Sequence, residues 1–81
     1  MSAILERLKI AAQEAQRVHK EQGLLVVLTI VTDGVLVNAK DYRFDLLRSH
    51  ATTATWHEIE TGLNNVLIGH ISRAVTELTS R

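Results

Sequence analysis

The chain is 81 residues long, enough for one small domain, and it contains neither cysteine nor proline, so disulfides cannot reinforce its core. Its nine basic and nine acidic side chains balance and are interspersed, which argues against a nucleic-acid-binding surface and against electrostatic binding to anionic lipid. No apolar run is long enough to cross a bilayer, and Glu6, Arg7 and Lys9 interrupt any signal peptide. We therefore expect a cytoplasmic protein with no membrane partner.

Residues 2–22 are predicted to form an amphipathic helix. Their apolar side chains recur at spacings of three and four residues, and charged residues occupy the opposite face. Ser2 suits the N-cap position, and Gly23 suits the position that ends the helix. The apolar stripe is rich in alanine, which favours close approach to a neighbouring element. It consists of Ile4, Leu8, Ala11, Ala12, Ala15 and Val18.

Residues 24–40 are predicted to form an antiparallel β-hairpin. The first strand consists mostly of Val, Leu, Ile and Thr, which suit a pleated surface. Asp33 and Gly34 favour a two-residue type I′ turn, because that turn needs positive φ at both positions. With these two residues as the loop, Thr32 lies opposite Val35.

The alternation of side chains separates two faces of this hairpin. One face is wholly apolar and is expected to pack into the core; its residues are Leu24, Val26, Leu28, Ile30, Val35, Val37 and Ala39. The other face is mixed, yet too apolar for an ordinary solvent-exposed face. Its large apolar residues are the candidate interface residues Leu25, Val27, Val31 and Leu36, and Tyr42 extends this set.

The alternation changes after Ala39. In an unbroken strand Asp41 would point into the core, whereas Tyr42 and Phe44 begin a new alternating apolar set. We expect a bulge near residues 38–41 that returns this set to the core, because one extra residue reverses the direction of every later side chain. The second strand would then be long and bent.

A third strand over residues 42–48 is the alternative to the bent strand. It is less favoured because it leaves the second strand very short. Residues 48–54 have the composition of a loop, and we predict that they connect the sheet to the next helix.

Residues 55–80 are predicted to form a second helix. Thr55 and Glu58 have the spacing of a capping box, in which each side chain bonds to a free backbone amide of the other residue. Gly62 and the pair Asn64-Asn65 are poor helix formers, so a kink or break near them stays open. The apolar stripe consists of Ile59, Leu63, Val66, Leu67, Ile71, Ala74, Val75 and Leu78.

Together these elements predict a single α+β domain over residues 1–81, in the order helix, strand, strand, helix. An antiparallel hairpin packed against two helices gives a two-layer sandwich. Because a two-stranded sheet is marginal alone and has open edges, we expect a homodimer that extends the sheet or stacks sheet on sheet. The alternative is a monomer in which the helices cover opposite faces. Trp56 is predicted to cap the core or to anchor a protein partner.

No pattern of catalytic, metal-binding or cofactor-binding residues is found. His57 and Glu58 do not make the zinc-protease motif, because Thr61 stands where the second histidine is needed. No glycine-rich loop opens a helix to bind phosphate. His70 is predicted to be a half-buried histidine with a hydrogen-bond partner, or alternatively a pH-sensitive contact across an interface.

The sequence therefore favours a small non-enzymatic adaptor or regulatory protein that acts through protein–protein contacts as a homodimer. The second hypothesis is an inhibitor of a host protein complex, encoded by a phage or mobile element, because such proteins are often short and lack an active site. A small histidine-dependent enzyme or metal-binding protein is the third hypothesis.

Overall fold

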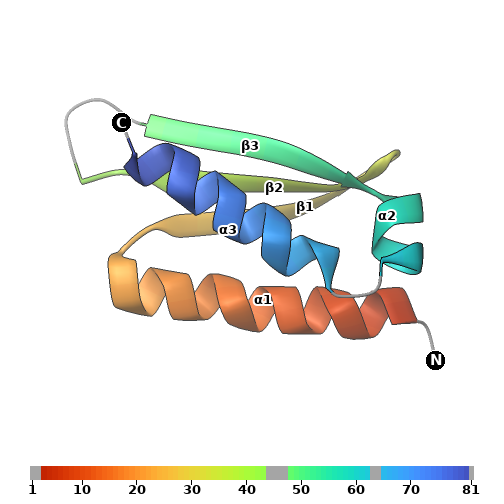
Figure 1. Cartoon of the computed structure of the whole chain (residues 1–81). Coiled ribbons are helices and arrows are strands. Elements are labelled where there is room, and N and C mark those ends of the chain that lie inside the picture. Colours follow the sequence, from red (N-terminus) through yellow and green to blue (C-terminus); the bar gives the residue numbers. More distant parts are fainter. Residues whose placement is uncertain (1–2, 44–47, 63–64, 81) are drawn as a thin grey trace.

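The computed structural model describes residues 3–43, 48–62 and 65–80. Within these residues three strands form one antiparallel sheet in the order β1-β2-β3, accompanied by three helices (Figure 1). The elements are α1 (Ala3–Gln22), β1 (Leu25–Val31), β2 (Gly34–Asp41), β3 (Arg48–Thr55), α2 (Trp56–Thr61) and α3 (Val66–Thr79). The predicted α+β class is confirmed, whereas the predicted element order is corrected by one extra strand and one extra helix.

The helices pack on one side of the sheet. α1 contacts β1 and α3, and α3 contacts β2 and β3 (Figure 1). Side chains along β2 alternate between buried and partly exposed positions from Val35 to Asp41, as expected for a strand with one covered face. The fold is therefore a two-layer sandwich, and the alternative with helices on opposite faces is not found.

The core lies between the sheet and the helices. The predicted core face of the hairpin is confirmed except at Ile30, which leaves 68% of its surface exposed near the turn. Leu28 is only partly buried against the core cluster. The other buried apolar residues are Leu24, Val26, Val35, Val37 and Ala39 from the hairpin, Ala54 from β3, and Ala11, Val18, Ile59, Leu67, Ile71, Ala74, Val75 and Leu78 from the helices.

The hairpin turn differs from the predicted one. Thr32 and Asp33 form the loop, Val31 lies opposite Gly34, and neither loop residue has a positive φ. Every residue of β1 therefore faces a β2 residue two positions before the predicted one. Because side chains alternate with a period of two, this displacement leaves the residues of each face unchanged.

β2 runs to Asp41 without the predicted bulge, so that prediction is wrong. Asp41 lies on the covered side of the sheet and is fully buried. Its carboxylate accepts hydrogen bonds from the Arg43 backbone N–H (3.0 Å), from the Arg43 guanidinium (3.0 and 3.1 Å) and from the Arg48 guanidinium (3.0 Å). The hydrogen bonds from Arg43, with that from Arg48, hold the pKa of Asp41 well below its usual range. A charged strand end is thus tolerated without a change of register.

The predicted loop over residues 48–54 is also wrong, because these residues form most of β3. β3 pairs antiparallel with β2, with Arg48 opposite Asp41 and Thr55 opposite Gly34. A third strand therefore exists, but it covers Arg48–Thr55 and not the residues 42–48 of the alternative prediction. Phe44 lies in the part of the chain, residues 44–47, that falls outside the described residues.

Two helices follow β3. The capping box is confirmed: the Glu58 N–H donates to the Thr55 hydroxyl (3.2 Å), and the Thr55 N–H donates to the Glu58 carboxylate (3.3 Å). α2 ends before Gly62, and the side-chain oxygen of Asn65 begins α3 by accepting a hydrogen bond from the Leu67 N–H (3.1 Å). The break that the sequence left open is therefore found.

Side chains fasten α1 to this break. The Arg7 guanidinium donates to the carbonyl oxygen of Ile59, and the side-chain amide of Asn65 donates to the Arg7 carbonyl (3.0 Å). These contacts hold both ends of the break against α1. None of the helices in the described residues is long and apolar enough to cross a membrane.

Replacing Thr55 with alanine is expected to reduce the free energy of unfolding by about 1 kcal/mol, because the first turn of α2 loses its cap. Urea denaturation followed by circular dichroism measures this loss. Thr53→Ala is the matched control, because Thr53 is exposed on the same strand, and its effect should stay within about 0.5 kcal/mol. Equal losses in the two variants would contradict the role of the cap.

Candidate protein-interaction surfaces

The side of the sheet that faces away from the helices is apolar along the edge strand β1 and at one position of the central strand β2. Leu25, Val27 and Val31 project from β1, and Leu36 projects from β2 between covered residues. Leu25 leaves 38% of its surface exposed, and the other three are partly exposed. We call this surface the open face. It brings together four of the six candidate interface residues.

Polar groups on the open face are mostly uncharged. Asn38 lies between Val27 on β1 and Ala51 on β3, and its side-chain oxygen is buried with no hydrogen-bond partner among the described residues. Lys40, two residues further along β2, is the charged residue that this strand places on the open face. The open face therefore offers mainly apolar area, with little net charge to attract an ionic ligand.

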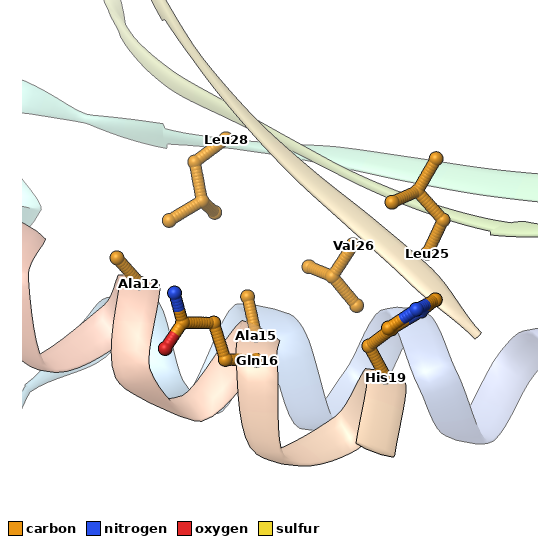
Figure 2. Close-up of a pocket in the computed structure, with 7 residues that line it drawn as sticks. All are labelled: Ala12, Ala15, Gln16, His19, Leu25, Val26 and Leu28. Carbon is orange, nitrogen blue, oxygen red and sulfur yellow. The ribbon is translucent and has the colours of Figure 1, made fainter. Parts of the chain in front are cut away.

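A second apolar surface is a groove of about 360 Å³ between α1 and β1. Figure 2 shows Ala12 and Ala15 on α1 pointing toward the strand, and Val26 and Leu28 on β1 pointing toward the helix. Gln16 and His19 of α1 and Leu25 of β1 complete the lining. We call this the α1–β1 groove. Its size depends on the alanines, since larger side chains at these positions would fill it.

The remaining candidate interface residues lie apart from the centre of the open face. Tyr42 follows the last residue of β2 and leaves 58% of its surface exposed. Trp56 is half-buried against the core, and its indole N–H donates to the carbonyl of Thr32 in the hairpin turn (2.9 Å). Trp56 thus makes the contacts of a core cap, and its role as a partner anchor stays a prediction.

His70 is half-buried and hydrogen-bonded, as predicted. Its Nδ1 lies 2.7 Å from the Thr52 hydroxyl, and its Nε2 lies 3.5 Å from the Glu58 carboxylate. The hydrogen bonds from Thr55, with that from His70, lower the pKa of Glu58. The hydroxyl, imidazole and carboxylate are in the order used for nucleophilic catalysis. The neighbouring hollow is lined by Glu58 and His70 but not by Thr52, and this chain of contacts joins β3, α2 and α3.

The other three histidines lie on α1, β3 and α2. His19 places Nδ1 3.3 Å from the Leu24 carbonyl oxygen, His50 lies on β3, and His57 is exposed on α2. Across residues 3–43, 48–62 and 65–80, no three His, Asp or Glu side chains gather where they could hold a metal ion.

Comparison of the chain with protein-family models, with curated proteins and with solved structures finds no match. Function is therefore inferred from the surfaces of the molecule itself.

Sequence reasoning found the open face but missed the α1–β1 groove. The open face follows from strand alternation alone, which is visible in residues such as Val27 and Leu36. The groove depends on how far α1 lies from β1. Its signal in the sequence is the pair Ala12 and Ala15, but small side chains at these positions are equally expected where a helix packs closely on its neighbour.

Proposed function

We propose that this protein is a non-enzymatic protein-binding module that acts as a homodimer. The observation that carries the proposal is that all three described helices pack on one side of the sheet, which leaves Leu25, Val27, Val31 and Leu36 on the other side. Large exposed apolar patches on small soluble domains usually mark surfaces that contact another molecule. A flat apolar surface on a partner protein is the chemistry that suits the open face.

The charges of the protein support contacts of this kind. The chain has no net charge at pH 7 with neutral histidines, and the buried Asp41 carboxylate is paired internally with Arg43 and Arg48. Long-range electrostatic attraction therefore contributes little to partner binding. The affinity should come from burial of apolar area, at roughly 25 cal/mol per Å², and should change little with salt.

The titratable groups that face one another also support a binding function over a catalytic one. Glu58 is engaged by the capping box and by His70, and His70 is engaged by Thr52. Each of these groups is used to hold elements together. The Thr52 hydroxyl, which would act as the nucleophile, does not line the hollow beside Glu58 and His70.

Replacing Leu36 with lysine is expected to weaken partner binding by at least about 10-fold, because it places a charge at the centre of the open face. Proteins captured from lysate by the wild type would be produced separately, and their Kd values would be measured with the wild type and with Leu36→Lys. The salt dependence of the wild-type Kd would be measured in the same series.

Ser72→Lys is the matched control, because Ser72 is exposed on α3 and the substitution adds the same charge on the helical side. Its Kd should equal that of the wild type. If both lysine variants bind the captured proteins as tightly as the wild type does, the open face is not the binding surface. If no protein binds the wild type saturably, the proposed function is wrong.

A further inference from the structure

β1 offers an open hydrogen-bonding edge, since it pairs only with β2 among the described residues. The Trp56 N–H donates to the Asp33 carbonyl (3.1 Å), which fixes the alternation of hydrogen bonds across the sheet. With the observed register, the peptide groups of Val26, Leu28 and Ile30 point away from β2. These groups are free to pair with another strand.

The two edges of the sheet differ in how well they are protected. Natural proteins discourage edge pairing with charged residues, prolines or bulges. β1 has the sequence LVVLTIV and pairs regularly with β2, so it carries none of these devices. β3 has the polar sequence RSHATTAT and begins with Arg48. β1 is therefore the edge suited to association.

An exposed apolar side chain and an apolar groove lie along the same side of β1. Ile30 projects on the helical side of the strand and leaves 68% of its surface exposed. Val26 and Leu28 project on the same side of β1 as Ile30, and both line the α1–β1 groove. Leu5, which is 51% exposed, lies seven residues before the groove residue Ala12 and hence on the same flank of α1.

We propose that a second copy of this chain pairs its β1 with β1 antiparallel about a two-fold axis at Leu28, so that Ile30 of each copy enters the α1–β1 groove of the other. This inference rests on the homodimer in the proposed function and names its interface. The result is one continuous six-stranded sheet.

The geometry of antiparallel pairing selects this register. A two-fold axis perpendicular to the sheet pairs residues of the same parity, because each face must stay on its own side. Only a centre at Leu28 pairs all seven residues of β1, from Leu25 to Val31. It places Ile30 opposite Val26, which lines the groove.

A second copy satisfies these features better than an unrelated strand does. The same chain supplies both the protruding Ile30 and the groove. In the proposed register Ile30 of each copy meets the groove of the other, because a two-fold axis repeats every contact. The chain has no net charge, so two copies do not repel each other at long range. Val27 then faces Thr29 of the second copy on the open face, and the two open faces join into a wider surface for a partner protein.

Ile30→Glu tests this interface. In an isolated chain the substitution replaces an exposed side chain, so the melting temperature of the fold should hardly change. In the dimer it puts a carboxylate into an apolar groove, and we expect the dimer Kd to rise by about 100-fold or more. Light scattering after gel filtration measures the mass, and circular dichroism measures the folding.

Ile10→Glu is the matched control. Ile10 is 47% exposed, and it lies about 200° round α1 from the groove residue Ala12. This variant should remain a dimer, as should the wild type. A wild type of monomer mass, or an Ile30→Glu variant that dimerises as tightly as the wild type, would overturn the proposed interface.

Cysteine cross-linking tests the register, because the chain has no native cysteine. At the proposed two-fold axis the Cα atoms of the two Leu28 residues lie about 5.5 Å apart, within the range that a disulfide spans. Leu28→Cys should therefore form a covalent dimer on mild oxidation, while Leu36→Cys on the open face should not.

The outcomes separate this inference from the proposed function. If Leu36→Cys cross-links and Leu28→Cys does not, the copies stack face to face, which overturns the edge interface but keeps the homodimer. If the wild type is a monomer that still binds a partner protein through Leu36, the edge interface and the homodimer both fail. The open face would then remain the binding surface.

Discussion

Gly34→Ala is expected to lower the free energy of unfolding by about 3 kcal/mol or more, enough to unfold much of this small domain. Gly34 has φ 159°, which non-glycine residues rarely adopt. A Cβ atom there would lie 2.8 Å from the Cα of Thr55 and closer still to the carbonyl oxygen of Ala54. Both obstacles are backbone atoms of β3, which cannot move without loosening the sheet.

Gly69→Ala is the matched control for this prediction. A Cβ at Gly69 would meet no atom within 4 Å, and alanine favours the helical conformation of α3 by about 1 kcal/mol over glycine. The same chemical change should therefore stabilise the protein at one position and destabilise it at the other. Urea denaturation measures both. A Gly34→Ala variant as stable as the wild type would mean that β3 does not approach β2 as closely as described.

Asp41→Asn is expected to lower the melting temperature by on the order of 5–10 °C at neutral pH. The substitution removes the charge that two guanidinium groups share, so Arg43 and Arg48 lose their ionic contacts with this residue at the covered end of β2. Asp41 is fully buried, and its hydrogen bonds to the guanidinium groups weaken when the carboxylate becomes a neutral amide, because charge-assisted hydrogen bonds are the stronger ones.

The pH dependence of the folding stability gives a second test of the contacts between Asp41 and the two arginines. The hydrogen bonds from Arg43 and Arg48 lower the pKa of folded Asp41 below that of the unfolded chain. As the pH falls below about 4, the unfolded chain takes up a proton at this carboxylate while the folded chain does not, so stability is lost. Above that pH the contribution is fully present.

Melting temperatures measured from neutral to acid pH check this sign. Asp41→Asn should show a shallower acid loss than the wild type. Asp33→Asn is the control, because Asp33 is exposed in the hairpin turn, and it should follow the wild-type curve. Parallel curves for the wild type and Asp41→Asn would contradict the depressed pKa.

The elements with a clear periodicity could be predicted from the sequence. The first helix and both hairpin strands lie where the apolar spacing indicates, and the hairpin faces survive the error in the turn. Thr55 and Glu58 make the capping box that their spacing predicts. These features depend on neighbours within a few residues, which is the range over which sequence patterns are informative.

The errors arose where residues distant in the chain decide the structure. Local patterning places Asp41 away from the covered side, because a lone charge is costly there, but Arg48 lies opposite it on β3 and pairs with it, as Arg43 does. The polar side chains of β3 predict a loop over the residues that form most of this strand. Thr52 and Thr53 suit a strand, yet only pairing with β2 shows that they form one.

The interaction surfaces divide in the same way. Val27 and Leu36 share the open face in any register that keeps the alternation, so they could be predicted. The exposure of Ile30 and the groove beside Val26 depend on where α1 crosses β1. That crossing is set by the packing of the whole core and is not visible in a local pattern.

Amide hydrogen exchange at the two edges of the sheet tests the central claim most directly. In the wild type the amides of Val26, Leu28 and Ile30 should be protected at high protein concentration, and should lose that protection on dilution or in Ile30→Glu. The outward amides of Ala51 and Thr53 on β3 should exchange rapidly under all these conditions. Rapid exchange at both edges at high concentration would contradict the pairing of β1 with a second copy.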